Sequence, residues 1–88
     1  MVWPVFQMED WRSFIGRRIR SLRQERSLSQ EKLALESEID LTYLGSIERG
    51  RRNPSLLVMA RIARALDVPL ASLFTPDATD IKKVSGVS

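Results

Sequence analysis

The sequence predicts an all-α domain of five helices, and three observations support that fold class. Apolar residues recur three and four positions apart along most of the chain, which is the spacing of one helix face. Three of these segments follow a residue that can cap a helix N-terminus, namely Ser29, Asp40 or Ser55. The chain has only four glycines, and no proline lies between residues 5 and 53, so helix breakers are scarce where the helices are expected.

The first helix is predicted from Trp11 to Glu25, with its apolar residues on one face. Those residues are Phe14, Ile15, Ile19 and Leu22. Asp10 is a suitable N-cap, although Glu9 or Ser13 would serve nearly as well. We expect residues 1–9 to form a short N-terminal arm, unless Met8 is the biological start of the protein. Trp3, Val5 and Phe6, together with Trp11 at the start of the helix, give this arm its apolar character.

The second helix is expected to be short. Ser29 can cap it, and Glu31 places an acid in its first turn, where the helix dipole favours negative charge. Leu28 and Leu33 flank the cap at the spacing of a hydrophobic staple, which sets the angle at which the chain enters the helix. The helix should end near Ser37, where polar residues follow.

The third helix is predicted to run from Leu41 to about Arg49, with Asp40 as its N-cap. Leu44 and Ile47 are three positions apart and should face the core. Gly50 lies where a left-handed residue commonly ends a helix.

Two further helical segments follow Pro54. Ser55 can cap a helix from Leu56 to about Leu66, and Val68-Pro69 should end it. The inward residues of that helix are predicted to be Leu56, Met59, Ile62, Ala63 and Leu66. Leu70 to Phe74 is long enough for a turn and a half of a fifth helix.

The chain has room for one domain, which we place at residues 10–75, followed by a flexible C-terminal tail at residues 76–88. The tail lacks helical periodicity. A domain within 88 residues has a small core and limited stability on its own. Dimerisation would therefore help to stabilise it.

The composition argues against an enzyme and against a metal protein. The chain contains no cysteine and no histidine, so it lacks a disulfide framework, a thiolate nucleophile, an imidazole base and the usual zinc ligands. We expect no catalytic residues, no metal and no cofactor. No signal peptide is evident, and no apolar run approaches the ~20 residues that cross a bilayer. A cytoplasmic protein without membrane contact is expected.

Positive charge is concentrated in two segments, although the net charge is only +3. Five arginines and no acid lie between residues 49 and 66, and five more arginines lie between residues 17 and 26, where Glu25 is the one acid. A clustered positive surface attracts polyanions even when the total charge is small. The aromatic residues are not interleaved with the arginines, which disfavours an RNA-stacking surface. DNA binding is the favoured interpretation, with an ordinary solvated surface as the alternative.

The segment from Leu28 to Leu73 resembles the Cro/repressor (XRE) family of helix-turn-helix proteins. The residues that carry the resemblance are Ser29-Gln30, Leu33-Ala34, Ile39, Leu44, Ile47-Glu48-Arg49-Gly50 and Asn53-Pro54-Ser55-Leu56. The resemblance implies a five-helix, lambda-repressor-like bundle in a bacterial regulator of double-stranded DNA, found with the nucleoid, whose third helix enters the major groove. The family often has a small residue and glycine at the turn, whereas this chain has Ser37 and Glu38, so Glu38 needs a tolerant backbone there.

The outward side of the third helix is predicted to contact DNA bases. It presents Leu41, Thr42, Gly45, Ser46 and Arg49. Thr42 and Ser46 can hydrogen-bond base edges, whereas Leu41 can make only apolar contact. Since long bidentate side chains are lacking on the helix face, we expect Arg49 or Arg52 to reach bases and DNA shape to add specificity. The predicted base contacts are Leu41, Thr42, Ser46, Arg49 and Arg52, and the alternative is that Thr42 and Ser46 merely face solvent.

Four residues are predicted to contact phosphates: Gln30, Tyr43, Arg51 and Asn53. The resemblance implies that Gln30 and the free backbone N–H groups of its helix hold a phosphate; otherwise Gln30 simply starts the helix. Tyr43 either binds a phosphate through its hydroxyl or covers the core edge. Arg51, Arg52 and Asn53 follow the third helix and should lie along the DNA backbone, or else form a solvated loop.

The resemblance further implies an ion pair between Arg23 and Glu48, which would tie the first helix to the third. One recognition helix touches few base pairs, so we predict a homodimer on a near-palindromic operator with half-sites about 34 Å apart. The predicted interface residues are Leu57, Val58, Leu70, Leu73 and Phe74. The alternative for Leu73 and Phe74 is that they close the core.

Residues 39–55 resemble the controller proteins of restriction–modification systems more closely than generic repressors. This resemblance implies a small dimer that binds operator repeats and regulates its own promoter and the endonuclease gene. An arginine is common in that group where this chain has Leu41. A generic phage-type repressor, or an antitoxin whose main partner is a toxin, is the alternative. A ligand-sensing domain does not fit in this length, so no small-molecule ligand is expected.

Overall fold

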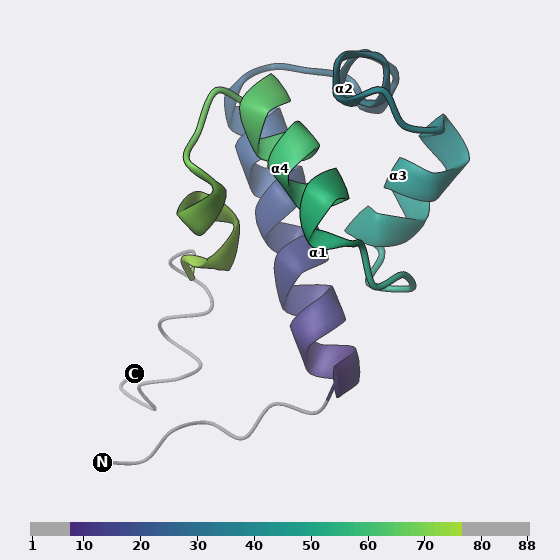
Figure 1. Cartoon of the computed structure of the whole chain (residues 1–88), viewed down its shortest axis with the longest axis vertical. Coiled ribbons are helices and arrows are strands. Elements are labelled where there is room, and N and C mark those ends of the chain that lie inside the picture. The colour runs from purple at the N-terminus through teal and green to yellow at the C-terminus, as the bar shows by residue number, and fades with distance from the viewer. Residues whose placement is uncertain (1–7, 77–88) are drawn as a thin grey trace.

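The computed structural model describes the backbone of residues 8–76 and the side chains of residues 11–76. Within that range the chain forms four α-helices followed by one 3₁₀ helix (Figure 1). These are α1 (Met8–Glu25), α2 (Gln30–Ser37), α3 (Leu41–Glu48), α4 (Leu56–Ala65) and η1 (Leu70–Phe74). The predicted all-helical class is confirmed for this range. Residues 1–7 of the predicted arm and residues 77–88 of the predicted tail lie outside the described residues.

The prediction of five α-helices is wrong at the last element, because Leu70–Phe74 is a 3₁₀ helix. Pro69 precedes it without a side-chain cap, and Thr75 after it is extended, with φ −91° and ψ 127°. Thr75 precedes Pro76, and a residue before proline is disfavoured in the α-helical region. A segment of five residues between these two ends is short, and short segments commonly form a 3₁₀ helix, which has three residues per turn.

The predicted N-caps of the three inner helices are confirmed. Ser29 Oγ accepts a hydrogen bond from the N–H of Lys32 at 3.0 Å, and Ser55 Oγ accepts one from Val58 at 3.1 Å. Asp40 likewise caps α3. The predicted Asp10 cap is wrong, since α1 begins at Met8 and Asp10 lies inside its first turn. No helix breaker separates Met8 from Trp11, so the helix continues past the predicted start.

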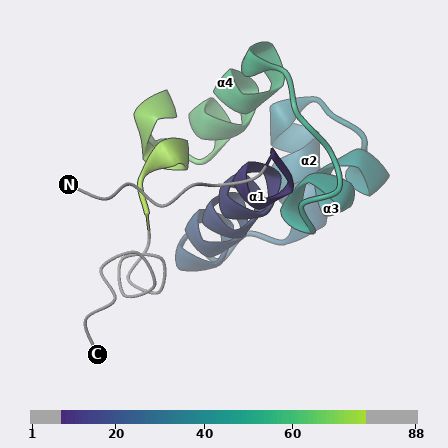
Figure 2. The same ribbon diagram turned by 90° about the horizontal axis from the view of Figure 1, so that it is seen from below.

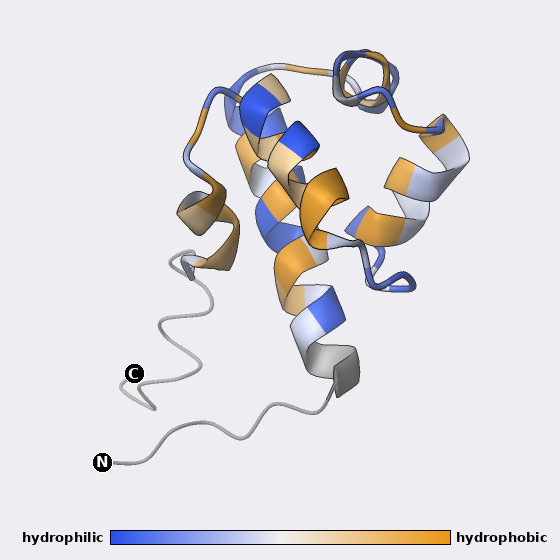
Figure 3. Ribbon diagram, viewed as in Figure 1, coloured by the Kyte–Doolittle hydropathy of each residue, from blue (hydrophilic) through white to orange (hydrophobic). Residues whose placement is uncertain are grey.

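The helices enclose one apolar core. α1 contacts α3 and η1, whereas α4 contacts α2 and η1 (Figures 1 and 2). The largest fully buried apolar side chains are Ile19, Leu33, Leu44, Ile47, Ile62, Leu66 and Leu73. Hydrophobic and hydrophilic residues alternate in bands along α1 (Figure 3), as expected for a helix with one buried face.

Leu56 departs from the predicted core, because 62% of its surface is exposed. Helical side chains lean toward the helix N-terminus. As the first residue of α4, Leu56 therefore projects past the end of the helix instead of onto the core.

Main-chain atoms set the distance between α1 and α3. A Cβ atom added to Gly16 of α1 would lie 2.3 Å from the carbonyl oxygen of Ile47 and 2.8 Å from that of Glu48. No side chain fits in that space, so the C-terminal turn of α3 lies directly on the backbone of α1. This contact fixes α3 against the longest helix of the described chain.

Candidate nucleic-acid interface

A tight turn joins α2 to α3. Glu38 adopts the left-handed conformation at φ 59°, and its N–H bonds to the carbonyl oxygens of Ala34 and Leu35. The backbone at this turn thus accommodates Glu38 in a left-handed conformation, as the sequence requires. Ser37, just before it, is fully buried, so a small side chain is needed where α2 meets the core. Asp40 then caps α3 by accepting a hydrogen bond from Tyr43 N–H at 3.1 Å.

The apolar side of α3 faces the core and its polar side faces outward. Leu44 and Ile47 are 0% and 1% exposed, as predicted. Thr42 and Arg49 are exposed, and Ser46 is half-buried. Leu41, at 40% exposure, leaves an apolar surface at the start of the helix. These side chains have the arrangement that a recognition helix needs.

Gly45 differs from the prediction, since it is buried although it lies on the polar side of α3. The cover comes from the ends of two long side chains. A Cβ atom added to Gly45 would lie 3.2 Å from Arg49 Nη1 and 3.8 Å from Gln30 Oε1. Arg49 Nη2 also donates a hydrogen bond to Ser46 Oγ at 3.3 Å.

Glu48 joins three helices beneath this surface. Arg23 of α1 donates through Nε to Glu48 Oε2 at 2.8 Å and through Nη2 to Oε1 at 3.1 Å. Gln30 of α2 donates through Nε2 to the same Oε1 at 2.9 Å. Glu48 is only 6% exposed, and a bidentate pair with little solvent around it holds its geometry well. We call Arg23, Gln30 and Glu48 the Glu48 cluster.

The role of Gln30 in the Glu48 cluster was not predicted from the sequence. Its amide N–H group is bonded to Glu48, and its side chain is half-buried. The amide therefore has a fixed position at the start of α2, close to the outward side of α3. Gln30 and Glu48 both belong to the residues that carry the family resemblance, which was the signal in the sequence. Their contact could not be read from it, because it depends on how α2 crosses α3.

The loop after α3 carries exposed polar side chains. Gly50 has φ 76°, as expected for the left-handed residue that ends the helix, and Arg51 N–H bonds to the carbonyl oxygen of Ser46 at 2.9 Å. The side chains of Arg51, Arg52 and Asn53 are exposed, and Asn53 also lines a small pocket with Trp11. The loop lies beside α3, on the side of the molecule away from η1 (Figure 1).

Tyr43 is half-buried and packs against the core. Its ring therefore covers the core edge, which was one of the two alternatives for this residue. The contact of its hydroxyl with a phosphate stays a prediction.

The predicted dimer residues have different degrees of exposure. Leu57 and Phe74 are 62% and 45% exposed, whereas Leu73 is 0% exposed. Leu73 therefore closes the core and has no surface to offer a second subunit. Val58 and Leu70 are half-buried beside the core.

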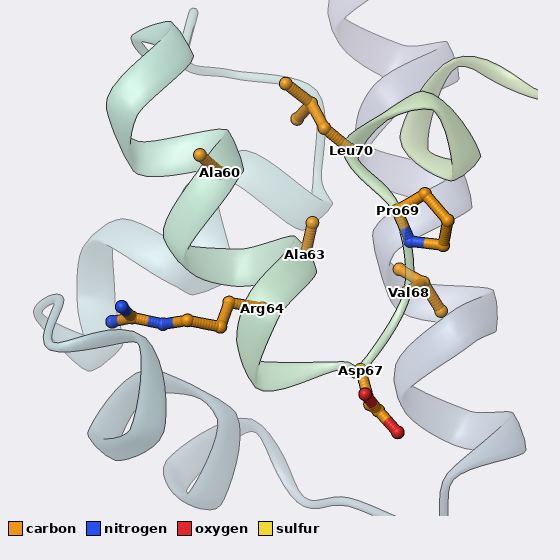
Figure 4. A pocket seen from close by; sticks show the side chains of 7 residues that line it. All are labelled: Ala60, Ala63, Arg64, Asp67, Val68, Pro69 and Leu70. Atoms are coloured by element: carbon orange, nitrogen blue, oxygen red, sulfur yellow. The ribbon is translucent and has the colours of Figure 1, made fainter.

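A shallow pocket separates α4 from the chain that leads into η1 (Figure 4). Ala60, Ala63 and Leu70 line it with small or apolar side chains, and Arg64 and Asp67 extend away from it. The pocket lies beside a second one that Leu57 lines, and both include Ala60. Both pockets also include Arg64, so charged side chains lie between Leu57 and Leu70.

Two negative findings apply to the described part of the chain. No cluster of acidic residues there could hold a metal ion. None of its helices combines the length and the apolar character that crossing a membrane requires.

The fold and the arrangement of α2 and α3 define a helix-turn-helix protein. A helix-turn-helix family model matches residues 19–73, and the chain belongs to that family. An uncharacterised helix-turn-helix transcriptional regulator of Sinorhizobium fredii, y4dJ, is 40% identical over 67 residues, which are 76% of this chain and 87% of the relative.

Restriction–modification controller proteins are also among the similar proteins. Control protein C.MunI of a Mycoplasma species is 39% identical over 77 residues, which are 86% of this chain and 99% of that protein. The crystal structure of the restriction-modification controller protein C.AhdI from Aeromonas hydrophila has a TM-score of 0.71 at 44% identity, covering 72% of this chain and 96% of that chain.

Proposed function

We propose that the protein is a transcriptional regulator that binds a specific double-stranded DNA sequence through α3. The observation that carries this proposal is the arrangement of α3, whose apolar side is buried while Thr42, Ser46 and Arg49 lie outward. The Glu48 cluster ties α3 to α1 and α2, so the helix is presented in one orientation. A preorganised helix loses little conformational entropy on entering the major groove.

In this proposal one group of residues contacts bases and another contacts phosphates. Leu41, Thr42, Ser46, Arg49 and Arg52 contact bases, and Gln30, Tyr43, Arg51 and Asn53 contact phosphates. The exposure of the loop supports the second group, since the side chains of Arg51 and Asn53 make no hydrogen bond within the described part of the chain and can turn toward DNA. Phosphate contacts fix the position of the helix, and base contacts provide specificity.

Autoregulation as a restriction–modification controller is the form of regulation that we propose. The alignment with C.MunI extends over 99% of that protein, and the C.AhdI structure is covered to 96%. The likeness to these two proteins therefore extends well beyond the α2–α3 motif. In this proposal a cytoplasmic dimer binds operator repeats upstream of its own gene.

Footprinting on the DNA upstream of the gene, with a salt titration of the same binding, tests the function. We expect a protected near-palindrome, an affinity ratio over random duplex of about 10³ or more, and a steep fall in affinity with salt. Equal affinity for upstream and random DNA would contradict autoregulation.

We also propose a homodimer, formed through an apolar strip that we define as Leu57 and Val58 of α4 with Leu70 and Phe74 of η1. Leu57→Asp should convert the dimer to a monomer, because it places a charge in an apolar interface. Analytical ultracentrifugation measures this. The matched control is Leu35→Asp on α2, where an even more exposed leucine, at 73%, lies outside the strip. If both variants stay dimeric, the strip is not the interface.

A further inference from the structure

The guanidinium group of Arg49 lies back over α3 instead of extending along the loop. Its Nη2 donates to Ser46 Oγ at 3.3 Å, and its Nη1 lies 3.2 Å from where a Cβ on Gly45 would be. Gln30 borders the same spot, with its amide oxygen 3.8 Å and its amide nitrogen 3.9 Å from that Cβ position. The arginine thus occupies the middle of the outward side of the helix.

Most hydrogen-bond donors of Arg49 are available to a ligand. A guanidinium carries five N–H donors in a planar fork, and Ser46 Oγ takes one of them. The side chain is exposed and pairs with no carboxylate of the described residues. Arg23 differs, since Glu48 and the carbonyl oxygen of Leu28 already accept from its Nε, Nη1 and Nη2.

We propose that Gly45 seats the guanidinium of Arg49 on α3 and that this guanidinium recognises a guanine. The proposal rests on the proposed function, because α3 must lie in the major groove for the seat to face bases. Guanine presents two acceptors, O6 and N7, in that groove, and the arginine fork matches them with two parallel bonds. In this proposal Arg51 contacts phosphates and not bases.

A glycine at position 45 requires a specific reason, which is either close approach of the DNA or the placing of Arg49. Glycine in a helix interior is destabilising relative to alanine, and Gly45 lies within α3 with its backbone in the helical region. The space that its missing side chain leaves is the space over which the guanidinium lies. A Cβ at 3.2 Å would require Nη1 to shift by a few tenths of an ångström, so the guanidinium would no longer lie in this position on the helix.

The test starts from a pool of random DNA duplexes, from which the wild-type protein selects its preferred sequence. Dissociation constants are then measured for that sequence and for each of its single-base-pair variants. The proteins compared are the wild type, Arg49→Ala, Arg49→Lys, Gly45→Ala and the double variant Gly45→Ala/Arg49→Ala. Arg51→Ala is the matched control, since it removes the same charge from the adjoining loop.

We expect Arg49→Ala to lose discrimination at one G·C pair of each half-site by roughly 5- to 150-fold. Arg49→Lys should lose it too, because an ammonium cannot form the fork, while its salt dependence stays that of the wild type. Arg51→Ala should weaken binding to all sequences alike and reduce the salt slope by about one. Uniform weakening by Arg49→Ala, with discrimination intact at every pair, would overturn the proposal.

Gly45→Ala should raise the melting temperature and reduce discrimination at the same G·C pair. In the Arg49→Ala background it should have no further effect on discrimination, since the two residues act as one unit. An equal loss of discrimination in both backgrounds would show that Gly45 acts without Arg49, which contradicts the proposal that Gly45 seats its guanidinium. If the wild type selects no sequence at all, the proposed function itself fails. If the wild type selects a sequence but the Arg49 variants keep its guanine preference, only the role of Arg49 fails.

Discussion

Arg23 of α1 and Arg49 at the end of α3 both bond to side chains of α3, but their guanidinium groups are used differently. Arg23 is held by Glu48 and the Leu28 carbonyl oxygen, with 13% of its side chain exposed. Arg49 is exposed, and among the described residues its guanidinium bonds only to Ser46 Oγ. An arginine with its donors satisfied stabilises the fold, whereas one with free donors can bind a ligand. The number of arginines in the sequence does not distinguish these two uses. The number of hydrogen-bond acceptors around each guanidinium in the structure does.

Glu48→Ala tests the buried side of this comparison and should have the largest effect. It leaves Arg23 without its carboxylate and also removes the partner of Gln30. We expect the free energy of unfolding to fall by about 3 kcal/mol, measured by urea denaturation. Glu36→Ala is the control, since its pair with Lys32 is 40–54% exposed and should contribute less than about 1 kcal/mol. Equal losses would mean that burial of the Glu48 cluster has no energetic consequence.

Gly16→Ala tests whether the backbone of α1 positions α3. The added methyl group would overlap the carbonyl oxygen of Ile47, so the helices must separate. We expect a loss of about 2 kcal/mol in unfolding free energy, together with weaker DNA binding at protein concentrations where the variant is still folded. A wild-type melting temperature would show that α1 and α3 can move apart without cost.

Ser37→Ala should act in the opposite direction and by a smaller amount. The hydroxyl of Ser37 is fully buried and has no hydrogen-bond partner among the described residues, so its removal should stabilise the fold by about 1 kcal/mol. Ser55→Ala makes the same chemical change at a working N-cap and should destabilise by about 1 kcal/mol. Thermal melts of both variants give the two signs, and destabilisation by Ser37→Ala would reveal a partner for its hydroxyl.

Arg52→Ala should leave stability within about 0.5 kcal/mol of the wild type, the smallest effect of the four, because its side chain is exposed. Its effect should appear in DNA binding instead. If Arg52 contacts phosphate, affinity falls for every sequence; if it contacts a base, discrimination relaxes at one position. Binding unchanged in both respects would reject both roles and weaken the comparison drawn above.

Features that depend on neighbouring residues were predicted well from the sequence. Ser29, Asp40 and Ser55 each bond to the N–H three residues later, and such caps require only local geometry. The left-handed conformation of Gly50 belongs to the same group. The exception is the start of α1, where several residues could serve as caps and the helix simply began earlier.

Among the features that depend on how helices cross, the Arg23–Glu48 pair was expected from the family resemblance and is present, whereas others were not predicted. The Gln30–Glu48 bond joins residues 18 positions apart, and the covering of Gly45 needs α2 beside α3. Periodicity also could not distinguish Leu56, which is exposed, from Leu73, which is buried. Both lie near a helix end, where the direction of a side chain depends on what the next element covers.

The direct contact of Gly16 with the Ile47 carbonyl oxygen has a consequence for the spacing of paired subunits on DNA. A contact between main-chain atoms keeps its distance when side chains change rotamer. The tilt of α3 relative to α1 is therefore the same in each subunit. In the proposed dimer, the separation of the two recognition helices then depends on the subunit junction alone. Variants of that junction would alter the number of base pairs between half-sites while leaving the sequence of each half-site as it was.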